Sequence, residues 1–134
     1  MLAEKLGHKE VDVLHLSLCL INDKIIKIFL KRLSVNTDKL IFKINNELAL
    51  VKKEPRDKNT TITLNESLKK ALIETYLTVY KKNELQVYPI NFLAGLEAYN
   101  DSLAEIFFDL ELDENKILNC IEWFYIDKKI ISQQ

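Results

Sequence analysis

The chain has 134 residues, a length typical of one domain, and 48% of them are hydrophobic, as in an ordinary globular protein. Glycine and proline occur only twice each, whereas all-β folds need many turns and turns are rich in both residues. This scarcity favours helices. The 19 basic and 20 acidic side chains leave a formal net charge of -1, which removes the basic surface on which nucleic-acid binding depends.

The cysteines and the terminal sequence limit the protein class further. Cys19 and Cys120 lie in apolar runs and are predicted to be buried free thiols, because cysteine packs as a small hydrophobic side chain. Met1–Lys5 lacks the apolar segment of a signal peptide, and no apolar run approaches the roughly 18 residues of a membrane helix. We therefore expect a cytoplasmic protein with no cofactor, no metal, and neither a membrane nor a nucleic acid as partner.

The first segments of the chain predict helices, with one ambiguity. In Val11–Ile21, positions 14, 16, 18 and 20 alternate as in a strand, whereas positions 11, 14, 18 and 21 follow helical spacing. Periodicity alone does not decide between them. Ile25–Leu33 has the spacing of an amphipathic helix with lysines on its other face, and Asn36 can act as N-cap of a further helix.

A polar stretch separates the two halves of the chain. Residues 52–61 contain no apolar side chain and include Pro55, which predicts a solvated linker over 52–62. Thr63 and Glu66 then have the spacing of a capping box. We expect Thr63 to be the N-cap of a long amphipathic helix that ends near Lys82.

Three further helices are predicted in the second half. Pro89 suits the first position of a helix, where its missing N–H costs nothing. Ser102 and Asp113 are expected to cap the two helices that follow. Trp123 and Tyr125 are expected to point away from the core.

An internal repeat connects the two halves. Leu33–Ile44 matches Leu110–Ile121 at a constant offset of 77 residues, and both the apolar pattern and a lysine recur. Upstream, Val11–Leu20 falls opposite Val87–Leu96 at an offset of 76, so one residue is inserted in the intervening turn. The second copy does not alternate as a strand would. The ambiguous segment 14–20 is therefore predicted to be helical.

The repeat predicts an all-α fold of about seven or eight helices, in which two units pack about a pseudo-twofold axis because neither alone can bury its apolar faces. The predicted domain spans residues 1–126 and comprises repeat one (1–51), the linker (52–62) and repeat two (63–126). Residues 127–134 are expected to be a frayed tail or the start of a linker. Only Met1–Leu6 precedes the first copy, so we expect the opening helix of repeat one to be truncated.

These residues resemble a known family. Leu6–Val11 (LGHKEV) and Leu14–Leu18 (LHLSL) are similar to the "LGH..V...HLLLAL" signature of the Clp N-terminal domain. Phe29–Leu40 resembles its "ILK.LGVD..KL" continuation, and the second copy shows the pattern at Asn91–Leu96 and Leu110–Asp113. From about residue 2 to residue 124, the chain thus resembles the N-terminal repeat domain (Clp-N) of ClpA-, ClpB- and ClpC-type AAA+ protein unfoldases.

The resemblance implies a double Clp-N motif that precedes AAA+ ATPase modules, binds protein substrates or adaptor proteins, and does no chemistry itself. The AAA+ modules of the parent chain and a Clp peptidase would then be further partners. A stand-alone Clp-N-like accessory protein that modulates a Clp protease is the alternative. An ATPase motif encoded after Gln134 would distinguish the two.

The expected binding residues lie at the start of the second helix of each repeat and beside the groove between the repeats. They are Val13, Leu14, His15, Asn65, Pro89, Ile90 and Asn91. ClpC-like members have Thr-Glu before the histidine, and that Glu holds the guanidinium of phosphoarginine. Leu14 and Ile90 replace it here, which makes phosphoarginine recognition unfavourable because the guanidinium would lack a counter-charge. Hydrophobic peptide or adaptor side chains would suit these positions better.

Other functional classes find little support in the sequence. His15 has apolar neighbours and only one other histidine in the chain, so we expect a structural role for it. No Ser-His-Asp or Cys-His arrangement can be placed from the sequence, and it contains no GxxxxGK[ST] motif, so no enzyme activity is expected. A helical DNA-binding regulator is disfavoured by the net charge. Asp101, Glu105 and Asp109 form an acidic stripe, either a solvated face or a docking patch for a basic partner.

Overall fold

The structure is a computed structural model, which describes residues 2–51, 53 and 61–132. Most of the predicted linker 52–62 lies outside the described residues. Its described members, Lys53, Thr61 and Ile62, belong to no helix or strand. The predicted linker conformation is therefore not tested.

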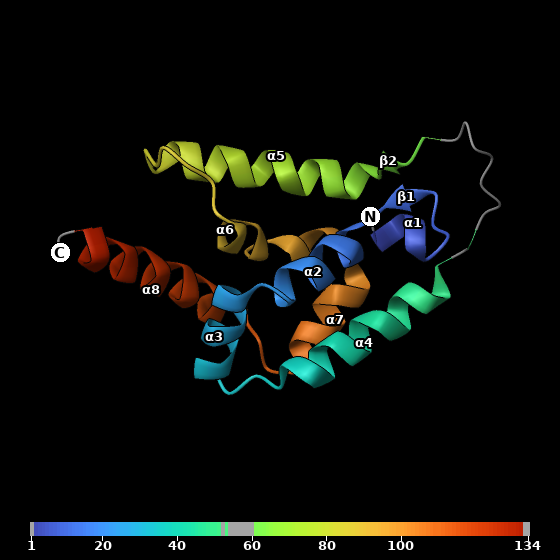
Figure 1. Cartoon of the computed structure of the whole chain (residues 1–134), viewed down its shortest axis with the longest axis horizontal. Coiled ribbons are helices and arrows are strands. Elements are labelled where there is room, and N and C mark those ends of the chain that lie inside the picture. Colours follow the sequence, from blue (N-terminus) through green and yellow to red (C-terminus); the bar gives the residue numbers. More distant parts are fainter. Residues whose placement is uncertain (1, 52, 54–60, 133–134) are drawn as a thin grey trace.

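The described residues form two similar runs of helices (Figure 1). The elements of the first run are α1 (Leu2–Lys5), β1 (Glu10–Val11), α2 (Val13–Ile21), α3 (Lys24–Arg32) and α4 (Thr37–Leu50). Those of the second are β2 (Thr63–Leu64), α5 (Glu66–Lys81), α6 (Pro89–Leu93), the 3-10 helix η1 (Leu96–Tyr99), α7 (Asp101–Asp109) and α8 (Glu114–Ser132). The all-α class is confirmed, and the ambiguous segment 14–20 is helical.

The backbone repeats with the offsets that the sequence predicts. The helices α3 and α7 begin 77 residues apart, as do α4 and α8, whereas α2 and α6 begin 76 apart. The left-handed residues that end the helices recur in the same way. Ser34 (φ 61°) corresponds to Glu111 (φ 57°), and Gly7 (φ 76°) corresponds to Asn83 (φ 59°). The double motif is confirmed down to these single turns.

The opening helices are the main difference between the repeats. The short helix α1 corresponds to only the last turn of α5, as the sequence predicts. Figure 1 shows α5 lying across the top of the molecule, above α6 and α2. A second difference is that α2 is continuous, whereas α6 stops before Gly95 (φ 85°) and η1 follows. Glycine adopts this φ without the strain that a side chain would add.

The helix caps test the turn predictions residue by residue. Asn36 and Asp113 accept hydrogen bonds from the amides of the third helical residues at 3.0 and 2.8 Å, and Pro89 is the first residue of α6, all as predicted. The predicted cap Thr63 is wrong. Thr63 lies in β2, which pairs in parallel with β1, so α5 begins later and Asn65 caps it.

A second cap prediction is also wrong. Asn100, with extended backbone, accepts from the amide of Leu103 at 2.9 Å and caps α7, while Ser102 lies inside the first turn.

The length of the last helix also differs from the prediction. The helix α8 continues to Ser132, through most of the segment 127–134 that was predicted to be a frayed tail or the start of a linker. Beyond the core this helix extends to the left in Figure 1.

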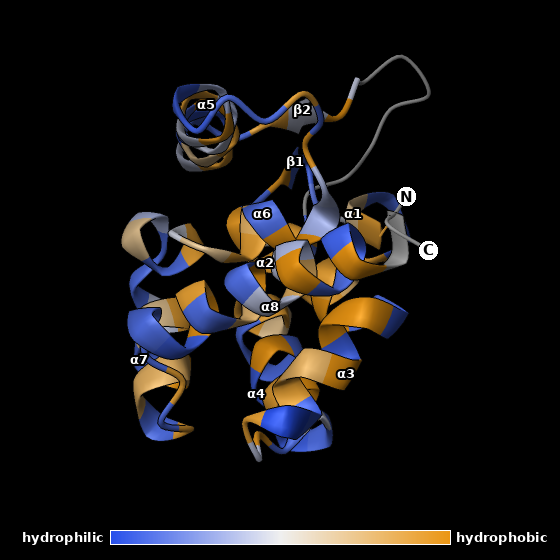
Figure 2. Ribbon diagram, turned by 90° about the vertical axis from the view of Figure 1, so that its left-hand side faces the viewer, coloured by the Kyte–Doolittle hydropathy of each residue, from blue (hydrophilic) through white to orange (hydrophobic). Residues whose placement is uncertain are grey.

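Both repeats contribute to one hydrophobic core, so they form a single domain. Figure 2 shows the hydrophobic faces of the helices turned toward one another. The fully buried side chains include Leu30 and Ile44 from repeat one and Leu103 and Phe107 from repeat two. Each such side chain stabilises the fold by roughly 1.5–3 kcal/mol relative to an exposed one. Among the described helices, none is long and apolar enough to cross a membrane.

Candidate functional site

The start of α2 is organised by two histidines. The backbone N–H of Asp12 donates to Nδ1 of His15 at 2.8 Å, so Nδ1 carries no proton. A neutral His15 therefore holds its proton on Nε2 and donates it to Nδ1 of His8, 2.7 Å away. The remaining proton of His8 is then on its Nε2, which is buried without a partner among the described residues. Both rings are only 2% exposed, which confirms the structural role predicted for His15.

This arrangement keeps His15 neutral. Burial lowers the pKa of His15 below its ordinary value of 6.5, the nearby His8 lowers it further, and Asp12 opposes both through its charge and its backbone hydrogen bond. A second proton on His15 would have to bind to Nδ1, where its N–H would face the N–H of Asp12. The histidines therefore hold the start of α2 in place, and both residues are buried.

In repeat two an asparagine replaces the histidine. Oδ1 of Asn91 accepts from the backbone N–H of Tyr88 at 2.7 Å, as Nδ1 of His15 does from Asp12. Nδ2 of Asn91 donates to the hydroxyl of Tyr125 at 3.1 Å, which connects α6 to α8. Tyr125 is therefore partly buried and tied to the core, and the prediction that it points away is wrong.

The same correction holds for its neighbour. Trp123 is partly buried and packs on the core, with its ring centroid 6.3 Å from that of Phe29. The contact pairs the last helix of repeat two with a helix of repeat one.

The predicted apolar binding residues lie deeper than expected. Val13, Leu14 and Ile90 are 0%, 4% and 1% exposed and belong to the core. Helical geometry explains this, because the first turns of α2 and α6 point these side chains toward the facing repeat. Of the other predicted residues, Pro89 is exposed and Asn91 is buried. The positions that carry Glu in ClpC-like members thus hold core side chains in this protein.

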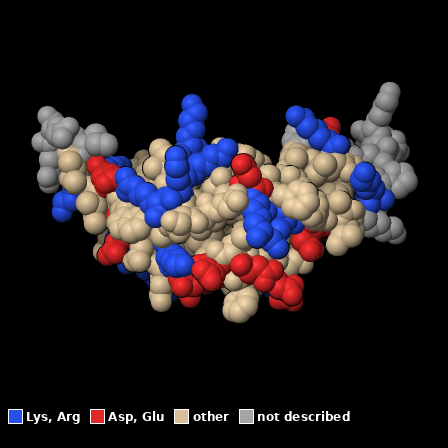
Figure 3. All heavy atoms as spheres, turned by 90° about the horizontal axis from the view of Figure 1, so that it is seen from below, with Lys and Arg blue, Asp and Glu red and all other residues tan. Residues whose placement is uncertain are grey.

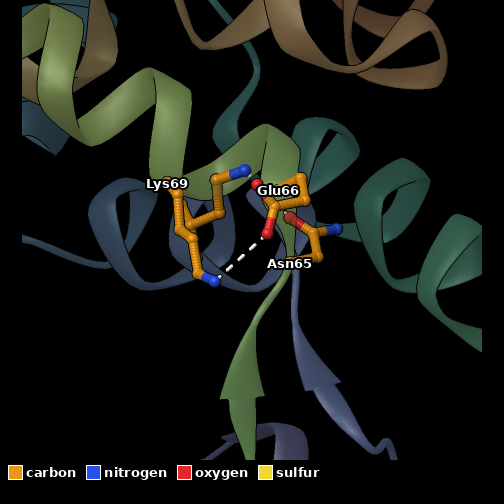
Figure 4. Close-up of polar contacts among 4 residues, drawn as sticks. Asn65, Glu66 and Lys69 are labelled. Atoms are coloured by element: carbon orange, nitrogen blue, oxygen red, sulfur yellow. Dashed lines mark hydrogen bonds and ion pairs between the residues drawn. The ribbon is translucent and has the colours of Figure 1, made fainter.

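The last predicted residue, Asn65, stands apart from the others. Figure 4 shows it where β2 passes into α5, beside Glu66 and Lys69. Its side chain accepts from the amide of Leu68 at 2.8 Å, and its own N–H donates to the carbonyl of Val11 at 3.0 Å. Asn65 is not among the residues that line the cavity of repeat two between α5, α6, η1 and α8, whereas Asn91 is. Its role in the structure is to join the short strand pair to the long helix.

A cavity of about 150 Å³ lies between α5, α6, η1 and α8. Apolar side chains form much of its wall, among them Val79, Leu118 and Ile121. Three carboxylates from different elements also line it, those of Glu74, Glu84 and Glu114, against one cation, Lys82. The Tyr99 hydroxyl donates to the Glu74 carboxylate.

The cavity lies within repeat two, whereas the prediction placed the groove between the repeats. An engineered cavity of about 150 Å³ admits benzene, so this one has room for a single side chain. Its walls favour an apolar stem with a positive or hydrogen-bond-donating end. Sequence reasoning missed Glu74, Glu84 and Tyr99, because their approach depends on how α5 crosses η1.

The thiols differ in reactivity. Cys120 is buried as predicted, and burial raises the pKa of its thiol to about 11. Cys19 is exposed, so the prediction that it is buried is wrong. The apolar run around Cys19 is helical, and the thiol occupies the one outward position between buried neighbours. No group of three or more possible metal ligands occurs among the described side chains.

Comparisons with known proteins agree with this architecture. A family model described as "Clp repeat (R) N-terminal domain" matches residues 1–109. A solved structure described as "Preliminary structural investigations of a malarial protein secretion system" has a TM-score of 0.79 and 21% identity, over 92% of this chain and 84% of that one. At this identity the likeness shows the fold alone. No curated protein sequence matches the chain significantly.

Proposed function

The chain belongs to the Clp repeat N-terminal domain family, and from this premise we propose that it is a docking domain of a Clp-type ATP-dependent unfoldase. It binds protein substrates or adaptor proteins in the cytoplasm and delivers them to AAA+ modules. It carries out no chemistry. The duplicated helical fold supports this role.

The cavity of repeat two is the proposed docking point, and it is the observation that carries the proposal. Its apolar wall suits side chains that are buried in folded proteins and exposed in unfolding ones. Glu74, Glu84 and Glu114 favour segments that also carry lysine, arginine or a free amine. Asn91, which lines the cavity, is the predicted binding residue that this assignment retains.

Phosphoarginine is not the proposed ligand of the paired Leu14 and Ile90 positions. Both side chains are buried and apolar, so a guanidinium there would have neither water nor a carboxylate. Isothermal titration with free phosphoarginine is expected to give no heat of binding. Tight binding would refute this part of the proposal.

The small cavity implies modest affinity for each copy of the domain. A single side chain buries too little surface to offset much of the entropy lost on association. Several copies on one ring would raise the apparent affinity by roughly 10²–10⁴-fold through avidity. Such a site suits a chaperone, because weak individual contacts let an unfolding chain move on.

The test is a titration of the ¹⁵N-labelled chain with a permanently unfolded protein rich in lysine and arginine, such as reduced lysozyme whose cysteines are blocked with uncharged carbamidomethyl groups. We expect the largest amide shifts around the cavity, at Glu84, Gly95 and Leu118. The double variant Glu84→Lys/Glu114→Lys should weaken binding roughly tenfold or more, since it reverses two of the three carboxylates.

A matched control has the same change in charge elsewhere. Glu10→Lys/Glu122→Lys reverses two exposed acidic residues that do not line the cavity. The control should bind as the wild type does. Equal weakening by both double variants, or shifts confined to other surfaces, would overturn the proposed docking point.

A further inference from the structure

The helices α3 and α7 occupy equivalent places in the two repeats but have opposite charge. In α3 the charged side chains are Lys24, Lys27, Lys31 and Arg32, with no acidic residue. In α7 they are Asp101, Glu105 and Asp109, with no basic residue. All seven are exposed. The pseudo-twofold axis thus relates a basic surface to an acidic one on similar backbones.

Most of these charges have no partner within the described chain. Arg32 lies 3.8 Å from Asp127, and Asp109 lies 3.8 Å from Lys43. The remaining three lysines of α3 and the other two acidic residues of α7 form no ion pair with a described residue. They are free to meet charges on another molecule.

Apolar features accompany the charges on each side. Beside the basic helix, a groove of about 340 Å³ is lined by Ile25, Ile28 and Phe29 of α3 and by Phe124 of α8. Ile25 and Ile28 are 47% and 55% exposed. On the acidic helix, Phe108 projects into solvent with 83% of its surface exposed. A cavity of about 150 Å³ already holds a benzene ring, so this groove has room for a phenylalanine.

The sequence differences between equivalent positions of α3 and α7 agree with a groove beside α3 and an exposed aromatic side chain on α7. At the 77-residue offset, Ile25 and Ile28 of the groove correspond to Ser102 and Glu105 of α7. The projecting Phe108 corresponds to Lys31. One surface therefore has a groove next to the lysines of α3, and its charged lining residues are Arg32, Lys128 and Asp127. Its counterpart has an exposed aromatic side chain on an acidic helix.

The two surfaces also face apart. Figure 2 places α7 and α3 on opposite sides of the lower part of the molecule. In Figure 3, a band of acidic side chains follows one edge of the lower face, and basic side chains lie in its middle and toward the other edge. An exposed side chain and a groove that point in different directions cannot meet within one chain.

From these observations we propose that a second copy of the chain docks head to tail. Phe108 of one copy enters the groove between α3 and α8 of the next, and the acidic residues of α7 face the lysines of α3. The contact is heterologous, because it joins two different surfaces, so it extends into a ring or an open row of domains. In either arrangement the cavities of repeat two are arrayed side by side.

The proposal predicts weak, salt-sensitive association. Exposed charges attract over roughly 30 Å at 0.01 M ionic strength but only about 3 Å at 1 M. Sedimentation velocity of the chain should give a weight-average mass that rises with concentration at low salt. At 1 M salt it should stay near the mass of one chain.

Charge reversal identifies the surfaces. Lys24→Glu/Lys27→Glu/Lys31→Glu leaves α3 with one cation against three carboxylates, so both surfaces are acidic. Asp101→Lys/Glu105→Lys leaves α7 with two cations against one carboxylate, so both surfaces are basic. Each variant alone should therefore remain monomeric. An equimolar mixture of the two should associate again, because it restores opposite charges across the contact. A mixture that stays monomeric while the wild type associates would overturn the proposal.

The exposed aromatic side chain of α7 has its own control. Phe108→Ala should raise the dissociation constant at least roughly tenfold, as expected for a central aromatic anchor. Phe42→Ala removes another exposed aromatic side chain, 64% exposed, from α4, and should have no effect. Far-UV circular dichroism confirms that each variant is folded. A wild type that stays monomeric at low salt and millimolar concentration, or an association that Phe108→Ala leaves unchanged, contradicts the proposed contact.

Discussion

Replacing His15 by the asparagine of the equivalent position, His15→Asn, is expected to reduce the acid sensitivity of the fold. His15 is neutral in the folded chain because it accepts from Asp12 through Nδ1 and donates to His8 through Nε2. Unfolding exposes it to water, where its pKa returns to the ordinary value of 6.5. Below that pH the unfolded chain binds a proton that the folded chain does not. Stability is therefore full above this pH and falls as the pH is lowered.

The size of the effect follows from one proton. The free energy of unfolding changes by at most about 1.4 kcal/mol for each pH unit over which only the unfolded state is protonated. Asn91 shows that an amide can accept the cap N–H at this place. His15→Asn still removes a ring contact and leaves Nδ1 of His8 without its donor, so it should cost roughly 1–3 kcal/mol at pH 7.5. Between pH 6.5 and 5.5 that difference should shrink by up to about 1.4 kcal/mol.

Urea denaturation of the wild type and of His15→Asn at pH 7.5, 6.5 and 5.5 measures the difference between their free energies of unfolding. The contributions of carboxylates that both chains share cancel in this difference. Long-range ¹H–¹⁵N correlation spectra of the histidines add a direct test, because they identify the protonated nitrogen. We expect the Nε2–H form of His15. Parallel pH profiles for the two chains, or a His15 that titrates in the folded state at 6.5 or above, would refute the reasoning.

Three further predictions concern single side chains. Burial, together with Glu114 and Asp113, raises the pKa of Glu97, so Glu97→Gln should stabilise the fold at pH 7 by up to about 1 kcal/mol and lose this advantage at pH 4, as thermal melts would show. A thiol reagent at pH 8 should label Cys19 quickly and Cys120, with its pKa of about 11, only after unfolding; prompt labelling of both would contradict the burial of Cys120. Gly7→Asn should be tolerated, because asparagine holds the equivalent left-handed turn, while Gly7→Val should cost at least roughly 1–2 kcal/mol in urea denaturation.

The architecture could be predicted because duplication leaves a signal along the chain. A constant offset in the apolar pattern identified equivalent helices and settled the ambiguous first segment. The caps Asn36 and Asp113 were also predictable, since a side chain that caps a helix acts on amides two or three residues away. Such local interactions are fully contained in a short stretch of sequence.

Long-range contacts could not be predicted, because they depend on residues that are far apart in the sequence. Thr63 has good capping spacing, but its pairing with Glu10, far away in sequence, displaces the start of the helix to Asn65. The hydrogen bond between Asn91 and Tyr125 joins residues 34 positions apart, and no pattern in the sequence predicts it.

Burial at the predicted site was misjudged because an apolar side chain near a helix start suits both a pocket wall and a core. Only the packing of the two repeats decides between these for Leu14 and Ile90. The acidic wall of the cavity likewise depends on how α5 lies over η1 and α8. The family was therefore readable from the sequence, whereas the position of the docking cavity required the structure.

Hydrogen exchange of the chain with and without an unfolded protein tests the central claim most directly. If repeat two docks its partner in the cavity, amides in 71–84 and 94–99 should gain protection, while those at the start of α2 should not change. Protection confined to the start of α2, or no protection at saturating partner, would contradict docking at this cavity.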